Sequence, residues 1–366
     1  MEIKATITGI EYQAKLHTEL KEVSMEDFDI NITPSNFLLK FDKNKLAVSK
    51  WVSPKRTRSY PYERVYNTLS STKKITIIPL VKDEGKTGDR DFIQWDTIAL
   101  MSLLDVYVIP AYYNDADKRI TSKGKAKITN QKFDNQYIIQ TIKAIPNYHS
   151  SALHWNLKQV KNLEKIVEKV KVSYAKIAAK TGVELKSEKG IDNFLSRLQE
   201  GMGEFMKFSR TKAQGAQNRE FVTIQPKEAL STSSKAKITI KNYLGGLYYF
   251  TVDEIEKSKN TLQLIEAKHS ISTVLPSRGD IKDGLIKMIL YTNLEDVHVD
   301  GKAMIVQPVL KLTSTKIKNT FDSRKNKLKL VSWCEAHDLK TSQVTFLNQL
   351  VDEARENGFS VIIEQA

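Results

Sequence analysis

The segment NTLQLIEAKHS, residues 260–270, places an acid and a lysine two positions apart at the end of an apolar run. The two side chains of this pair, Glu266 and Lys268, would share one face of a strand, because side chains alternate along it. A carboxylate there can bind a hard cation such as Mg²⁺, and a lysine beside it can stabilise charge on a phosphoryl group. The pair is therefore typical either of a surface ion pair or of a metal-dependent nuclease site.

The same acid-x-lysine pattern occurs elsewhere in this lysine-rich chain, so the surrounding sequence has to decide its meaning. The other occurrences begin at Glu2, Glu19, Glu84, Glu184, Asp280, Asp300 and Asp338. They lie at the chain end, in turn-like or charge-dense segments, or beside an expected helix. Only Glu266 ends an apolar strand that forms the second arm of an expected hairpin. A helical pattern, DIKDGLIKMILYTNL, then follows.

The expected hairpin supplies a second carboxylate. A two-residue turn at Lys259 and Asn260 would place Asp253 directly opposite Glu266, on the same face. A slip of one residue would move Asp253 to the other face. Two opposed acids repel each other unless a cation lies between them, which favours a metal site. We therefore predict Asp253 and Glu266 as ligands of Mg²⁺ and Lys268 as their electrostatic partner in catalysis.

This arrangement resembles the PD-(D/E)XK nuclease superfamily, which includes many type II restriction endonucleases. The resemblance covers roughly residues 245–295, from the hairpin through the helix that follows it. It implies a mixed central sheet flanked by helices, an acid on one strand and an acid-x-lysine on the next, and a Mg²⁺ cofactor. It also implies double-stranded DNA as the substrate.

Two other acids are candidates for the same site. Glu63 lies in YPYERVYNTL, a helix that leads into the strand KKITIIPLV, and this succession is similar to the opening of such folds. Asp253 is not part of a Pro-Asp dipeptide, so Asp91, in GDRDFIQWD, is the alternative first ligand. Acids near helix starts also serve as caps and as favourable charges on the first turn, and this simpler role remains open for both.

The charge balance favours a polyanionic partner. Lys and Arg number 57 against 43 Asp and Glu, for a net charge of +14 and a pI near 9.4. Cations that neutralise phosphates release condensed counterions, which drives binding to nucleic acid. Basic and aromatic residues alternate in SPKRTRSYPY, residues 53–62, and two further basic segments span residues 117–127 and 316–330. The predicted DNA contacts are Lys55, Arg56, Arg58, Tyr60 and Tyr62.

Composition and periodicity predict a mixed α/β protein with a helical insertion. Residues 1–129 form an N-terminal α/β part of the core, residues 130–220 a helical insertion that could recognise DNA, and residues 221–366 the catalytic hairpin with its following helix. The single cysteine, Cys334, excludes an internal disulfide framework. We see no secretory leader and no apolar run that could span a bilayer, so we expect a soluble intracellular protein without a membrane partner. The resemblance to restriction enzymes implies that it works in the cytoplasm.

The prediction from the sequence is a Mg²⁺-dependent endodeoxyribonuclease of the type II restriction kind, cutting double-stranded DNA at a specific site. Cutting both strands usually needs two active sites, so we expect a homodimer. A non-catalytic nucleic-acid-binding protein and a structure-specific repair nuclease are the alternatives, and the metal-binding residues do not distinguish DNA from RNA. The recognition sequence and the position of the cut cannot be read from the chain.

Overall fold

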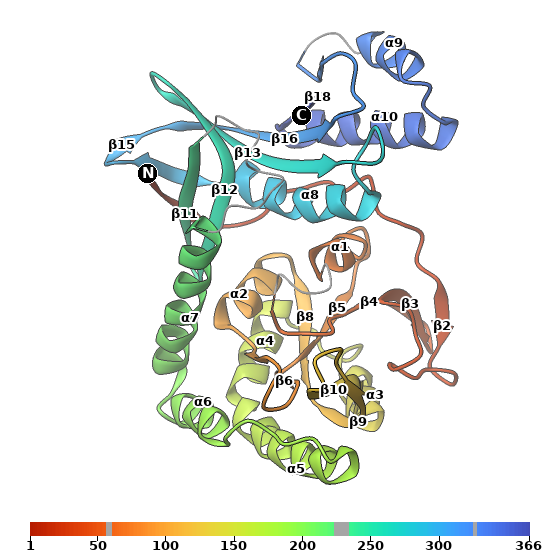
Figure 1. Cartoon of the computed structure of the whole chain (residues 1–366), viewed down its shortest axis with the longest axis vertical. Coiled ribbons are helices and arrows are strands. Elements are labelled where there is room, and N and C mark those ends of the chain that lie inside the picture. Colours follow the sequence, from red (N-terminus) through yellow and green to blue (C-terminus); the bar gives the residue numbers. More distant parts are fainter. Residues whose placement is uncertain (56–60, 223–233, 325–327) are drawn as a thin grey trace. The chain divides into compact units, whose positions relative to one another are not determined.

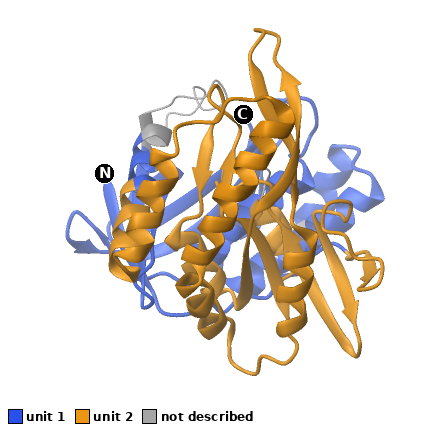
Figure 2. Cartoon of the chain, turned by 90° about the horizontal axis from the view of Figure 1, so that it is seen from below, with its two compact units in different colours: residues 1–18, 212–366 blue, residues 19–211 orange. Residues whose placement is uncertain are grey.

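The computed structural model describes residues 1–55, 61–222, 234–324 and 328–366 (Figure 1). The chain forms two compact units, which Figure 2 colours separately. Unit 1 contains residues 1–18 and 212–366, and unit 2 contains residues 19–211. The mixed α/β class is confirmed, with large mixed sheets and a helical segment from α3 to α7.

Unit 1 is built on a mixed sheet. Among the described residues it has nine strands, in the order β15-β14-β1-β11-β12-β13-β16-β18-β17. The strands are β1 (Glu2–Ile7), β11 (Ser234–Asn242), β12 (Leu247–Ser258), β13 (Thr261–Ser270), β14 (Glu295–Val299), β15 (Lys302–Ala303), β16 (Ile305–Ser314), β17 (Phe321–Asp322) and β18 (Ser360–Gln365). The predicted hairpin is β12 and β13, and β13 also pairs in parallel with β16. The candidate residues therefore lie on central strands, whose backbone is fixed on both sides.

Helices cover this sheet. They are α8 (Arg278–Thr292), α9 (Leu328–Ala336) and α10 (Thr341–Asn357). Helix α8 packs against β13 and β16, and α10 packs against β18 (Figure 1). Ser277 caps α8, because its hydroxyl accepts a hydrogen bond from the backbone N–H of Asp280 at 3.1 Å. Most of its apolar residues are buried, among them Ile281, Leu285 and Ile289, so α8 is enclosed on more than one side.

Unit 2 has a five-stranded sheet among its described residues, in the order β2-β3-β4-β5-β8, and two separate hairpins. The sheet strands are β2 (Glu22–Ser24), β3 (Asn36–Phe41), β4 (Asn44–Lys50), β5 (Lys74–Pro79) and β8 (Val106–Ala111); the hairpins are β6 (Val81–Asp83) with β7 (Arg90–Phe92) and β9 (Tyr113–Ile120) with β10 (Ala126–Phe133). The helices are α1 (Pro61–Tyr66), α2 (Trp95–Leu103), α3 (Asn135–Ala144), α4 (Ala152–Lys161), α5 (Leu163–Thr181) and α6 (Lys189–Gln199). Helix α7 (Met202–Val222) carries the chain from unit 2 into unit 1.

The structure adds detail to the sequence-based expectations. Within the helical segment, α4 and α5 meet at Asn162, and Gly182 ends α5 in the left-handed conformation. The basic segment 117–127 forms the tip of the β9–β10 hairpin. The compact units divide the chain at 18/19 and 211/212, so helices α3 to α6 share unit 2 with the strands that precede them; the functional division at 129/130 and 220/221 stays a prediction.

No helix in the described part of the chain is long and apolar enough to cross a membrane.

The N-terminal segment that leads out of β1 is held to α10 by a buried carboxylate. Glu353 is fully buried and accepts hydrogen bonds from the Tyr12 hydroxyl at 2.5 Å and from the backbone N–H groups of Lys15 and Leu16 at 2.8 and 3.1 Å. A buried charge is stable only when its lone pairs are used in this way.

We predict that Glu353→Gln lowers the free energy of unfolding by roughly 2 kcal/mol, because the charge-assisted bonds to buried donors are weakened. Glu356→Gln is the matched control on the same helix. Glu356 pairs with Lys15 at 2.5 Å, but both side chains are more than a third exposed, so we expect a change below about 0.5 kcal/mol. Urea denaturation of the two variants tests this, and equal losses would contradict it.

Candidate active site

The predicted register of the β12–β13 hairpin is the observed one. Glu254 pairs with Ile265 and Ser258 with Thr261, and the same register continued by one position would place Asp253 beside Glu266. The pairing of β12 with its other neighbour, β11, shifts between Val252 and Ile255, so β12 is irregular at this point. The backbone N–H of Ala267 donates to Oδ2 of Asp253 at 2.9 Å, which ties the side chain to the neighbouring strand. The hairpin therefore presents both carboxylates and Lys268 on one face.

Glu266 is the centre of the cluster. Its side chain is 2% exposed, and each of its oxygens contacts an ammonium group. Lys268 Nζ lies 2.8 Å from Oε1, and Lys287 Nζ, on α8, lies 2.6 Å from Oε2. Lys268 also lies 3.5 Å from Asp283 on α8, so the cluster joins two strands and one helix.

Helix α8 lies directly over this face because it has a glycine at the point of contact. A Cβ atom placed on Gly284 would lie 3.0 Å from Cε of Lys268 and 3.0 Å from Cδ1 of Leu310, closer than side chains normally pack. The neighbouring positions Asp283 and Lys287 are one helical turn apart and so point to the same side. The close approach brings both of them to the strand residues.

The two opposed carboxylates differ strongly in acidity. Burial alone would raise the pKa of Glu266, but the ammonium groups of Lys268 and Lys287 outweigh it and lower the pKa to about 2. Burial raises the pKa of Asp253 to about 7, and the negative charge of Glu266 adds to this effect. Burial also raises the pKa of Asp283. Glu266 is thus ionised at neutral pH, whereas ionisation of Asp253 is disfavoured by its surroundings.

The side chains fit a two-carboxylate Mg²⁺ site. Oδ1 of Asp253 accepts no hydrogen bond from the described residues, and its raised pKa shows that a nearby cation would stabilise its charge. Mg²⁺ commonly takes one or two protein carboxylates and completes its shell with water and substrate oxygens. Within the described ranges, no group of three or more His, Cys, Asp or Glu residues could hold a metal ion, so any ion would depend on Asp253 and Glu266. One ammonium group would have to leave Glu266 to make room.

The additional acids have other partners in unit 2. Glu63, in α1, accepts a hydrogen bond from the Asn67 side chain at 2.7 Å, four residues along the chain. Asp91, in β7, accepts one from the Ser53 hydroxyl at 3.2 Å. Both contacts are local to unit 2, and a catalytic role for either acid stays a prediction.

Of the predicted DNA contacts, two lie in the described part of the chain. The Lys55 side chain is exposed, whereas Tyr62 is 6% exposed and its ring packs edge-on against Trp51. Arg56, Arg58 and Tyr60 lie outside the described residues. Because its ring is buried, Tyr62 has little surface on which a base could stack. Lys55 is exposed and can reach a phosphate.

The sequence reasoning missed Asp283 and Lys287. Their side chains reach the site because α8 packs across the hairpin, which no pattern within the strand reveals. One signal was present: Lys287 interrupts the apolar stretch LIKMILY of a helix expected to be buried. A lysine in such a place needs an anionic partner, and Glu266 is that partner.

No family model matches this chain, and neither a curated protein nor a solved structure matches it. No family is therefore shown by comparison, and what the site does has to be argued from its side chains.

We predict that Asp253→Asn stabilises the protein at pH 8. The pKa of Asp253 is higher in the folded state, about 7, than its ordinary value of 3.8, so the folded state binds more protons between these values and stability falls as pH rises through that window. Asparagine can still accept from Ala267 and never ionises. We expect a gain of roughly 2 kcal/mol at pH 8 that shrinks towards zero near pH 4, measured by urea denaturation without divalent metal. A gain that does not change with pH would contradict it.

We also predict that Gly284→Ala lowers the free energy of unfolding by about 1 kcal/mol, because the methyl group must displace Lys268 or Leu310. Gly279→Ala in the same helix is the control. The nearest atom to an added Cβ there is Oγ of Ser277 at 3.7 Å, an ordinary contact, so stability should stay equal or rise slightly. If both variants unfold at the same urea concentration, α8 does not depend on close approach at Gly284.

Proposed function

We propose that the chain is a Mg²⁺-dependent endonuclease that hydrolyses phosphodiester bonds of double-stranded DNA, of the type II restriction kind. The observation that supports the proposal is the hairpin, in which Asp253 bonds the backbone of Ala267 beside Glu266 and Lys268 contacts Glu266. This combination matches the PD-(D/E)XK pattern on which the expectation was based. Two carboxylates and a lysine on adjacent strands have a direct use in phosphodiester hydrolysis.

Each side chain has a role in this proposal. Asp253 and Glu266 would hold the metal ion, which when bound polarises a phosphoryl oxygen and lowers the pKa of an attacking water. Lys268, once it moves away from Glu266, is placed to stabilise negative charge on the phosphate or to orient the water. Lys287 keeps Glu266 ionised and in place, because it donates to Oε2 from α8. Asp283 is a second partner that can hold Lys268 when the metal is bound.

DNA is the proposed substrate because of the charge balance. The net charge of +14 favours a polyanion, and most of the excess of Lys and Arg falls in residues 19–211. Under the proposal, unit 2 supplies much of the electrostatic affinity, with Lys55, Arg56 and Arg58 among the contacts and Tyr60 and Tyr62 beside them. A homodimer that cuts both strands and a cytoplasmic location against foreign DNA belong to the same proposal.

A second candidate is a non-catalytic nucleic-acid-binding protein, in which the cluster only stabilises the fold. One observation favours it: both oxygens of Glu266 are already paired with lysines, which is a complete arrangement without metal. A structure-specific repair nuclease would use the same residues as the first proposal. Cleavage of DNA at one fixed sequence would distinguish a restriction enzyme from a structure-specific repair nuclease.

The test is the cleavage of unmodified plasmid and phage DNA with Mg²⁺ or with EDTA. We expect discrete bands with Mg²⁺ only, and losses of at least ~100-fold in rate for Glu266→Gln, Lys268→Ala and Asp253→Asn. Glu254→Gln is the matched control, because Glu254, also on this hairpin, forms a largely buried pair with Lys311 at 2.5 Å. Its cleavage rate should stay within about threefold of the wild type.

Binding of DNA without cleavage under several divalent metals would favour the non-catalytic protein. Cleavage that survives Glu266→Gln and Lys268→Ala would place the chemistry elsewhere, and Asp91 would be the next acid to replace. A smear without discrete bands would indicate a nuclease that does not recognise a sequence.

A further inference from the structure

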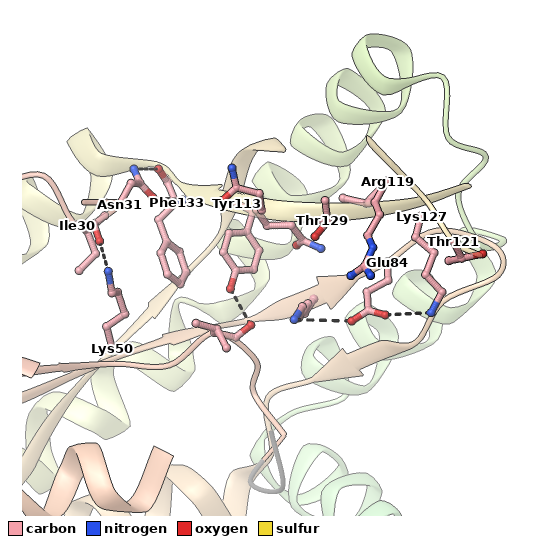
Figure 3. A pocket seen from close by; sticks show the side chains of 15 residues that line it. Ile30, Asn31, Lys50, Glu84, Tyr113, Arg119, Thr121, Lys127, Thr129 and Phe133 are labelled. Carbon is pink, nitrogen blue, oxygen red and sulfur yellow. Dashed lines mark hydrogen bonds and ion pairs between the residues drawn. The ribbon is translucent and has the colours of Figure 1, made fainter. Parts of the chain in front are cut away.

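A separate pocket lies within unit 2. Its volume is about 530 Å³, and its walls come from the β9–β10 hairpin, from β6 and the residues after it, and from the segments around Ile30 and Lys50. Figure 3 shows Arg119, Lys127 and Glu84 gathered at one end, Lys50 at the other, and the rings of Tyr113 and Phe133 between them. A pocket of this size holds a small organic ligand rather than a single ion.

The pocket is strongly cationic. Four of its lining side chains are basic, namely Lys50, Lys82, Arg119 and Lys127, and Glu84 is the one acid among the lining residues. Glu84 lies between Lys82 and Lys127, with N–O distances of 3.7 and 3.5 Å. Arg119 forms no ion pair with any described residue. The positive charge therefore exceeds what the pocket itself neutralises.

The ammonium group of Lys50 is held by backbone oxygens, and no acidic side chain of the described residues forms an ion pair with it. Its Nζ donates to the backbone oxygens of Ile30 and Thr33 at 2.6 and 2.7 Å. Burial lowers the pKa of Lys50 to about 8, and the nearby Arg64 adds to the effect, while Asp29 partly opposes it. A negatively charged ligand would relieve this cost.

The walls between the charged ends are fixed before any ligand arrives. The side chain of Asn31 bonds the backbone of Phe133 twice, accepting at 2.7 Å and donating at 3.1 Å. Tyr113 stacks on Phe133 at 4.4 Å between ring centroids, and its hydroxyl donates to the Val52 oxygen.

The ladder between β9 and β10 is also interrupted beside the pocket. The pairing shifts register after Thr129, and Asn130 adopts a φ of 46°. Bulges of this kind often redirect side chains towards a binding site. The hydroxyl of Thr129, on the pocket wall, makes no hydrogen bond with the described residues and is available to a ligand.

We propose that this pocket binds a phosphate-bearing ligand of nucleotide size, with the phosphate against Arg119 and Lys127. The planar guanidinium fork of arginine matches phosphate oxygens, and a lysine beside it adds charge. The rest of the pocket, from Thr129 to Lys50, offers hydroxyl, amide and ammonium donors to the rest of the ligand. The site uses none of the residues of the hairpin in unit 1 and goes beyond the proposed nuclease.

The test is isothermal titration of the full chain with the four deoxynucleoside monophosphates, with inorganic phosphate and with citrate as a carboxylate control. We expect a mononucleotide to bind at least ~10-fold more tightly than phosphate or citrate, since only it fills the pocket. Arg119→Ala and Lys127→Ala should each weaken the binding at least ~10-fold. Lys176→Ala, an exposed charge on α5 that does not line the pocket, should leave it unchanged.

A parallel titration with a short single-stranded oligonucleotide identifies the source of the nucleotide. Tighter binding of the oligonucleotide, competed by the mononucleotide and lost in Arg119→Ala, assigns the pocket to a nucleic-acid strand. Binding of the mononucleotide alone assigns it to a free nucleotide. The proposal fails if no nucleotide binds at millimolar concentration, if citrate binds equally well, or if Lys176→Ala weakens binding as much as Arg119→Ala. Thermal unfolding of the variants confirms that each is folded, as expected for exposed or half-buried positions.

Discussion

The buried carboxylate of Glu266 is the interaction on which the organisation of unit 1 depends. An isolated charge at this depth would be strongly unfavourable, and removing one partner of such a pair typically costs about 3–5 kcal/mol. Lys268 satisfies it from the same strand and Lys287 from α8, so the charge can be buried only where helix and strand meet in one position. Gly284 makes that position reachable, because a side chain there would hold the helix away. The packing of α8 on β13 and the contacts of Glu266 with the two lysines therefore depend on each other.

The contrast between Asp253 and Glu266 separates this cluster from an ordinary structural ion pair. The two lysines contact Glu266, whereas Asp253 accepts its hydrogen bond from the backbone N–H of Ala267. Two titratable groups whose surroundings push their pKa values apart are characteristic of catalytic sites. Ionisation of Asp253 therefore costs stability as pH rises through about 7, and a cation shared by the two carboxylates would offset that cost.

Patterns within one or two adjacent strands could be read from the sequence, and contacts between distant segments could not. The alternation of side chains and the short turn at Lys259 and Asn260 sufficed to place Asp253 against Glu266. Lys287 was missed because its role depends on how α8 crosses the sheet. The β9–β10 hairpin was missed because its exposed arms carry basic residues in place of an apolar alternation. The parallel pairing of β1 with β11 joins residues more than two hundred positions apart, which explains why the predicted boundaries differ from the compact units.

Under the proposed function, the two units would divide the work of DNA cleavage. The acids that would hold a metal lie in unit 1, while most of the excess positive charge lies in unit 2. Affinity from phosphate neutralisation falls steeply with salt, whereas a buried ion pair or metal site is screened far less. Binding and bond cleavage should consequently respond to different variables: ionic strength acts on the first, and pH, through Asp253, acts on the second. Under the proposed function, a cation bound beside Glu266 would favour the ionised form of Asp253, which burial and the charge of Glu266 otherwise disfavour.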